Sequence, residues 1–113
     1  MKQLRLYQGY TPQKAKAFYE GVLIDMKVYG QLFTGNEIKS FIENPFEVIK
    51  DKALIVIDHL GKNKPSSKID WNALLNKLYS NWKDEYKCSV LIFTNDPISK
   101  TLIRDPKVEY KRI

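Results

Sequence analysis

Two stretches dominated by apolar residues decide the fold that the sequence pattern predicts. Residues 53–57 are all apolar, and residues 89–93 form a second strand of the same kind. A strand that is apolar on both faces is covered on both faces, as in the centre of a parallel sheet with helices on either side. Shorter strands are expected at residues 4–7, 31–34 and 108–113. The two apolar strands should therefore be adjacent and central.

Helices are expected between the strands, because apolar residues recur there at three- and four-residue steps. Thr11 and Pro12 provide an N-cap and a first-turn proline, and Gly30 stands where a left-handed C-terminal residue belongs. A long helix is expected between them, and its stripe of apolar and aromatic residues should lie in the core: Ala15, Phe18, Tyr19, Val22, Leu23, Met26 and Tyr29. A shorter helix over residues 38–42 is interrupted by Pro45. A further long helix presents one apolar face, which consists of Trp71, Leu74, Leu75, Leu78, Trp82 and Tyr86.

Alternating strands and helices predict an α/β fold. We expect a three-layer α/β/α domain over residues 1–113, with about five strands in a mainly parallel sheet. Ligands bind to such sheets beyond the carboxyl ends of the strands. Polar residues cluster at two of these ends, namely Asp58 with His59 and residues 94–96. A functional site is therefore expected at this edge of the sheet.

The charge balance allows several kinds of partner. The chain has 113 residues, and 19 Lys and Arg against 13 Asp and Glu give a formal charge of +6. This balance is compatible with nucleic acid or an acidic protein as partner, but a lysine-rich solvated surface explains it without any partner. Lys62, Lys64 and Lys68 form the densest basic stretch, with Trp71 just beyond it. These lysines are the candidates for contact with single-stranded DNA or a partner protein, and a solvated loop is the alternative.

The few residues of high chemical reactivity limit the classes of site. A single cysteine, Cys88, and a single histidine, His59, exclude a disulfide framework within the chain and a zinc site of Cys and His residues. Cys88 is expected to be a small core or boundary residue. No apolar run approaches the roughly 20 residues that span a bilayer, and the first residues carry no apolar stretch of signal-peptide length. We therefore expect a cytoplasmic protein without a membrane partner.

Two segments resemble motifs of a known ATPase family. Residues 53–58, followed by Leu60-Gly61 and Lys64-Pro65, resemble the Walker B region of bacterial helicase-loader ATPases of the DnaC/IstB type. Residues 90–95 resemble the sensor-1 strand of the same family, which ends in Thr-Asn. The resemblance implies a core like that of the AAA+ group of P-loop NTPases. It also implies a replication protein as partner.

The motifs of an active ATPase are incomplete in this chain. A P-loop needs two glycines, then a lysine and a hydroxyl residue, to hold the phosphates and Mg²⁺. Gly9 and Lys14 stand at the expected place, but the second glycine and the hydroxyl residue are absent, and Pro12 lacks an N–H. His59 stands where the family has a second acid. The chain ends at Ile113, so the helical lid of these ATPases is expected to be missing.

These departures predict a non-catalytic interaction module rather than an enzyme. It would be an accessory or inhibitory factor of DNA replication, of the kind that a virus or mobile element carries. Its partner would be a helicase, a helicase loader or single-stranded DNA, and no cofactor is expected. The vestigial nucleotide site would consist of Gly9, Lys14, Asp58 and Asn95, with Asp58 as the ligand if Mg²⁺ is bound.

Two other functions remain open at this point. One is a nucleotide-binding ATPase with an atypical P-loop, which would use ATP and Mg²⁺. The other is an unrelated α/β protein that binds a different ligand or single-stranded DNA. The site residues also have plain alternatives: Asp58 as a cap of the following loop or the partner of a lysine, His59 as a satisfied loop histidine, and Asn95 as a turn residue.

Overall fold

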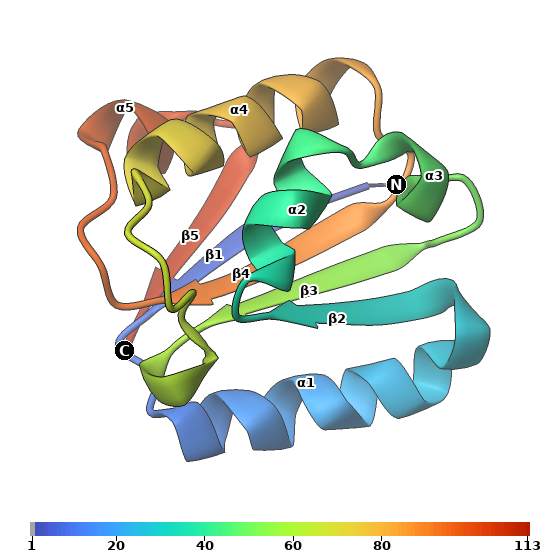
Figure 1. The fold of residues 1–113 in the computed structure, drawn as a ribbon, viewed down its shortest axis with the longest axis horizontal. Coiled ribbons are helices and arrows are strands. Elements are labelled where there is room, and N and C mark those ends of the chain that lie inside the picture. Colours follow the sequence, from blue (N-terminus) through green and yellow to red (C-terminus); the bar gives the residue numbers. More distant parts are fainter. Residues whose placement is uncertain (1) are drawn as a thin grey trace.

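Five strands form one parallel sheet in the computed structural model, which describes residues 2–113 (Figure 1). The strands are β1 (Leu4–Gln8), β2 (Gly30–Thr34), β3 (Leu54–His59), β4 (Ser89–Thr94) and β5 (Val108–Arg112). Their order across the sheet is β2-β3-β4-β1-β5. β4 is central and β3 lies beside it, as their apolar sequences predicted. The expected α/β class with a parallel sheet of five strands is confirmed.

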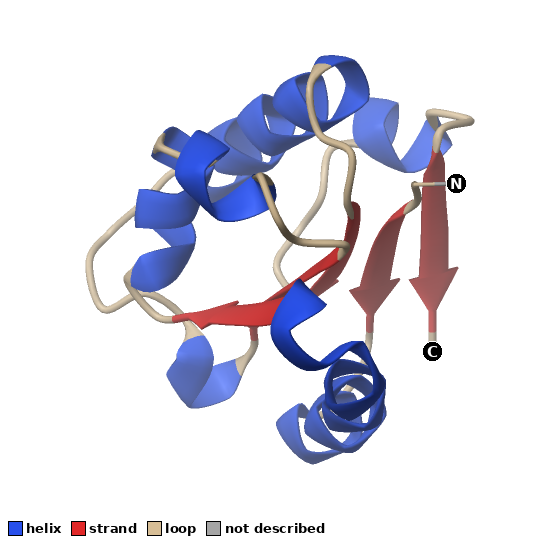
Figure 2. Ribbon diagram, turned by 90° about the vertical axis from the view of Figure 1, so that its right-hand side faces the viewer, coloured by secondary structure: helices blue, strands red, loops and turns tan. Residues whose placement is uncertain are grey.

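Helices cover both faces of the sheet. They are α1 (Pro12–Met26), α2 (Glu37–Glu43), α3 (Phe46–Ile49), α4 (Trp71–Asp84) and α5 (Lys100–Arg104), with 3₁₀ turns η1 (Lys27–Tyr29) and η2 (Gly61–Asn63). α1 packs on one face and α2 to α5 pack on the other (Figure 2). The chain steps across the sheet in one direction from β1 to β2 and in the other direction from β2 to β5. Crossovers of one hand therefore place α1 opposite the other helices.

The alternation of side chains along β3 supplies both cores. Ile55 and Ile57 pack under α2 and α4, whereas Leu54 and Val56 pack under α1. The predicted apolar face of α4 is buried at every position, and Cys88 is fully buried between α4 and β4. The prediction of two covered faces is therefore correct residue by residue.

The end of the first helix differs from the prediction. α1 ends at Met26, and the residue with a positive φ at this helix end is Lys27, with φ of 55°. Gly30 is extended and begins β2. A Cβ on Gly30 would lie 2.9 Å from side-chain atoms of Leu23 and Met26, so this glycine permits a close approach of β2 to α1.

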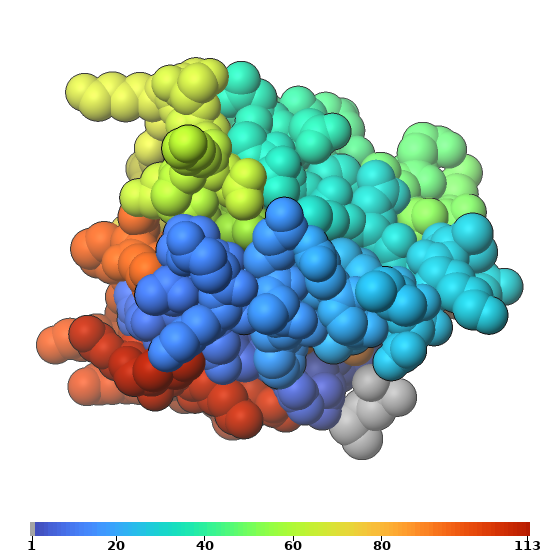
Figure 3. Space-filling view, turned by 90° about the horizontal axis from the view of Figure 1, so that it is seen from below, coloured from blue at the N-terminus to red at the C-terminus, as the bar shows by residue number. Residues whose placement is uncertain are grey.

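Two aromatic residues assigned to the core by the helical stripe are exposed. Phe18 is 40% exposed and Tyr29 is 58% exposed, while Ala15 and Tyr19 of the same stripe are buried. α1 is the only helix described on its face, so its flanks meet solvent. Figure 3 shows it across the middle of this face, with the C-terminal segment beside its N-terminal half. The prediction that the whole stripe of α1 lies in the core was therefore only partly correct.

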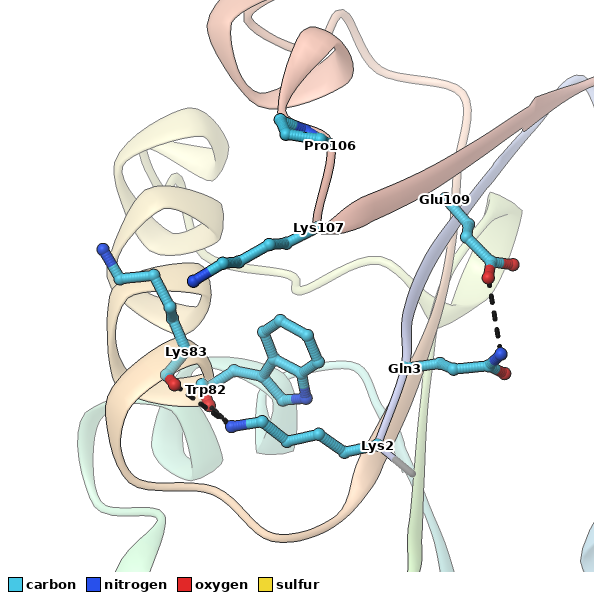
Figure 4. Close-up of a pocket in the computed structure, with 7 residues that line it drawn as sticks. All are labelled: Lys2, Gln3, Trp82, Lys83, Pro106, Lys107 and Glu109. Carbon is cyan, nitrogen blue, oxygen red and sulfur yellow. Dashed lines mark hydrogen bonds between the residues drawn. The ribbon is translucent and has the colours of Figure 1, made fainter.

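Lys2 connects the N-terminal segment to the C-terminal end of α4. Its ammonium donates hydrogen bonds to the carbonyl oxygens of Trp82, Tyr86 and Lys83, at 2.5, 2.8 and 3.1 Å (Figure 4 shows the first and third). It also lies 4.7 Å from the centroid of the Trp82 ring. The last carbonyls of a helix lack partners within the helix and carry partial negative charge, so a cation is stabilising there.

We expect Lys2→Met to lower the free energy of unfolding by about 1 kcal/mol, because two carbonyls in the last turn of α4 and the Tyr86 carbonyl just beyond it lose a charged donor. Urea unfolding is the measurement. Lys107→Met is the matched control. Lys2 and Lys107 line the same pocket (Figure 4), but the Lys107 ammonium makes none of these bonds. An equal loss in both variants would contradict a capping role for Lys2.

Candidate functional site

The carboxyl edge of the sheet is the place where this topology offers a site. The connections that follow β1 and β4 leave to opposite faces, and the crevice between two such strands is where ligands bind in open α/β sheets. Gly9 follows β1 and Asn95 follows β4, while Asp58 lies near the end of β3. The structure thus brings three of the four residues of the predicted nucleotide site to one edge.

Asp58 is fully buried, and hydrogen bonds occupy both of its oxygens. Oδ2 accepts from the Tyr19 hydroxyl at 2.6 Å and from Asn63 Nδ2 at 2.9 Å, and Oδ1 accepts from the Leu60 N–H at 3.2 Å. Burial and the Asp58 acceptor together raise the pKa of Tyr19 far above its ordinary value. Asp58 therefore caps the loop after β3 and ties that loop to α1.

The strand also extends further than the sequence predicted. Asp58 and His59 belong to β3 and pair with Phe93 and Thr94 of β4, so the strand does not end at Asp58. His59 is correspondingly not a loop residue. Parallel pairing on both sides holds Asp58 in place, because Thr34 of β2 is its partner on the other side.

The turn after β1 is closed by Asn95. Asn95 Oδ1 accepts from the Gly9 N–H at 2.6 Å, and Asn95 Nδ2 donates to the Tyr10 carbonyl at 3.0 Å. Gly9 has φ of 94°, and a Cβ there would lie 2.8 Å from the Ile113 carbonyl oxygen, so only glycine fits. The N–H that would meet a phosphate in a P-loop is thus already used.

Aromatic packing also fills the space next to this turn. The Tyr10 ring contacts Tyr7 and Phe93 edge-on, with centroids 5.5 Å apart in both pairs. Lys14 lies exposed in the first turn of α1, and its N–H donates to the N-cap Thr11. The turn is therefore anchored by Tyr10 rather than arranged around an open cradle.

His59 and Trp71 form a buried stack at the same edge. Their ring centroids are 3.8 Å apart and their planes differ by 4°. Thr94 Oγ1 accepts from Trp71 Nε1 at 3.0 Å and from the Asp96 N–H at 3.2 Å, and it lies 3.2 Å from His59 Nδ1. Because both lone pairs of the Thr94 hydroxyl accept hydrogen bonds, we assign its O–H as a donor to His59 Nδ1. Nδ1 can accept this bond only when it carries no proton, so the imidazole of His59 is neutral.

The surroundings of His59 agree with that assignment. Burial lowers the pKa of His59, and the charge of Lys64 lowers it further, while Asp96 and Asp58 act in the opposite direction. The unfolded chain, with an ordinary pKa near 6.5, therefore takes up a proton that the folded protein excludes. The folded state loses stability as the pH falls below about 6.5.

We expect the free energy of unfolding to fall between about pH 7.5 and pH 5.5, with a slope of at most about 1.4 kcal/mol per pH unit. His59 is the chain's only histidine, so His59→Phe should remove this slope while keeping a ring against Trp71. Urea unfolding at several pH values tests this. The same slope in wild type and His59→Phe would show that His59 is not the titrating group.

The three lysines of the loop after β3 do not act as one patch. Lys64 forms an ion pair with Asp96 at 2.5 Å, and Lys62 is exposed on η2. Lys68 instead lines a cleft between α2 and α4. Trp71, considered as an aromatic neighbour for single-stranded DNA, is only 6% exposed because it stacks on His59. A base therefore has no access to its face.

The arranged residues do not fit Mg²⁺ with ATP. The oxygens of Asp58 are bound to Tyr19, Asn63 and Leu60, and the Gly9 N–H is bound to Asn95. Within residues 2–113, no three His, Cys, Asp or Glu residues are grouped so that they could hold a metal ion. Binding of the nucleotide in the way that the P-loop family binds it would require these contacts to break.

Comparison with known proteins adds no relative. No protein-family model, curated protein or solved structure matches the chain. Over the described residues 2–113, no helix combines the length and the hydropathy needed to cross a membrane. Function must therefore be argued from the geometry and from the motifs.

Proposed function

We propose that this protein is a non-catalytic interaction module, built on a core that resembles helicase-loader ATPases. The observation that carries this proposal is the closed environment of Asp58. A carboxylate that binds a metal ion needs an oxygen that the ion can reach, whereas Asp58 is fully buried and its two oxygens already accept three hydrogen bonds, from Tyr19, Asn63 and Leu60. The residues that would bind and activate ATP instead hold the edge of the sheet together.

The motif resemblance supports a partner in DNA replication. It places the strand like Walker B at β3, the strand like sensor-1 at β4 and the P-loop position after β1. Their carboxyl ends meet at one edge, with β4 between β1 and β3. The proposed role is that of an accessory or inhibitory factor, from a virus or mobile element, that binds a replicative helicase or its loader. The proposed setting is the cytoplasm.

The two other functions have less support. An ATPase with an atypical P-loop needs Gly9 and Asp58 in other contacts than those they make. Binding of single-stranded DNA by stacking on Trp71 is disfavoured by the burial of its ring. An unrelated α/β protein with another ligand is the remaining alternative, and the partner experiment below separates it from the proposal.

We expect no Mg²⁺-dependent phosphate release from ATP and no ATP binding by calorimetry, because several contributors to phosphate binding and transfer are absent together. The matched variant is Lys14→Ala, since Lys14 is exposed and its replacement leaves the fold intact. Phosphate release by wild type that Lys14→Ala abolishes would overturn the proposal in favour of an ATPase.

The partner is tested with purified replicative helicase and helicase loader from the native host. We expect the chain to form a complex with one of them in size-exclusion chromatography, without added nucleotide. A chain that binds neither protein would refute the replication role.

A further inference from the structure

A basic cleft lies between α2 and α4, and none of the residues whose contacts close the carboxyl edge lines it. Its volume is about 300 Å³. Three lysines line it, each from a different segment: Lys39 of α2, Lys68 of the loop before α4, and Lys77 of α4. Because Lys39 is far from Lys68 and Lys77 in the sequence, the fold is what brings the three positive charges together.

The loop before α4 is held against α2, which places Lys68 at the cleft. Asn36 Oδ1 accepts from the Ser66 N–H at 3.1 Å, and Asn36 Nδ2 donates to Ser66 Oγ at 3.0 Å. Asn36 directly precedes α2, so these bonds join the two walls of the cleft at one end. Lys68 therefore belongs to an ordered segment, and the cleft is preformed.

The positive charge of the cleft is not neutralised within the described chain. None of the ion pairs among residues 2–113 involves Lys39, Lys68 or Lys77. The one acidic residue in the lining is Asp70, whose Oδ1 accepts from the Ala73 N–H as the N-cap of α4. Three cations thus face one carboxylate that is already engaged with a helix end.

The floor of the cleft is apolar. Ile69 is half-buried and packs against the core, Leu74 is buried, and Ala73 is exposed between them. A floor of this kind matches an apolar side chain, and a lysine rim matches carboxylates around it. No aromatic residue lines the cleft, so it lacks the stacking surface that unpaired bases use.

We propose that this cleft binds an acidic peptide segment of a partner protein, with an apolar side chain on the floor and Asp or Glu residues at the lysines. The inference rests on the proposed function, because it identifies the chemistry that an interaction module would recognise. The charge of the cleft argues for an acidic partner and its floor for a peptide rather than a nucleic acid.

The experiment selects binders from a display library of random short peptides, with the wild-type protein as bait. We expect the enriched peptides to be acidic, with an apolar residue among the acids, and to bind more weakly as salt is added. Replacing Lys39, Lys68 and Lys77 together by Gln should weaken their binding at least about tenfold. The matched control replaces Lys16, Lys100 and Lys111 by Gln, which removes the same charge from other surfaces.

A second variant tests the floor without disturbing the fold. Ala73 is exposed in the first turn of α4, where an acidic residue favours the helix. Ala73→Glu should therefore leave the folded state intact and weaken binding of an acidic peptide by charge repulsion. The Ala73→Gln protein carries a side chain of the same size without the charge, so it should bind the peptide more tightly than the Ala73→Glu protein does. Urea unfolding of both variants confirms that a loss of binding is not a loss of folding.

Several outcomes would overturn the inference. The first is a selection that enriches no peptide, or only peptides without acidic residues. The second is peptide binding that the three Lys→Gln changes do not weaken. The third is tighter binding of oligothymidylate than of the peptides, lost when the same three lysines are replaced. Each would leave the proposed function standing if ATP is neither bound nor hydrolysed. Conversely, ATP hydrolysis would refute the proposed function even if the cleft binds acidic peptides.

Discussion

Asp58→Ala is expected to lower the free energy of unfolding by about 3–5 kcal/mol, because two buried donors and one partly buried donor lose their acceptor at once. The Tyr19 hydroxyl, the Asn63 amide and the Leu60 N–H would then face a small cavity without a partner. Urea unfolding near pH 7 measures the change. Asp51→Ala is the control, since Asp51 is exposed and a surface substitution should change stability by less than about 0.5 kcal/mol.

The sign of this result bears directly on function. A carboxylate kept for a cation is held in an unfavourable setting, so its removal often raises stability. A carboxylate that caps a loop lowers stability when it is lost. If Asp58→Ala is as stable as wild type, Asp58 does not link the loop after β3 to α1, and a nucleotide site at this edge is no longer disfavoured.

The parts of the fold that could be predicted were those governed by burial on two faces. The apolar residues of β3 and β4 required helices above and below, and the sheet order places these strands inside. The apolar face from Trp71 to Trp82 on α4 was equally clear, because the helical period of its apolar residues leaves no other side to bury; Tyr86 is also buried, but it lies beyond the end of α4.

Features that depend on contacts between distant segments could not be read from local pattern. Gly30 was interpreted as the end of a helix, yet it is needed where β2 passes close to Leu23 and Met26. Phe18 fits the stripe of α1, yet no second helix among the described residues covers the neighbouring surface. In both cases the local sequence is compatible with the prediction, and tertiary packing decides otherwise.

The site shows the same division. The sequence predicted where Asp58 and Asn95 would lie, because strand ends of a parallel sheet share one edge. It gave no signal for Tyr19, whose position in the helical stripe suggested only core packing. The sequence also gave no sign that Lys68 and Lys39 line one cleft. Their proximity depends on the hydrogen bonds between Asn36 and Ser66. The residues that gather at the carboxyl edge of the sheet can thus be predicted from the strand ends, but the hydrogen bonds that these residues make cannot.

Leu78→Ala is expected to cost about 2–5 kcal/mol, since the side chain is fully buried where α4 meets the sheet. The loss combines the transfer free energy of the removed atoms with the cavity left among neighbours that cannot all move inward. Asn76→Ala, on the exposed side of the same helix, is the control and should change stability by less than about 0.5 kcal/mol. Urea unfolding of both variants separates packing from helix propensity, because both introduce the same residue into α4. A cost below about 1 kcal/mol for Leu78→Ala would mean that this face of α4 is loosely packed, and α4 could then not serve as the rigid wall that the basic cleft requires.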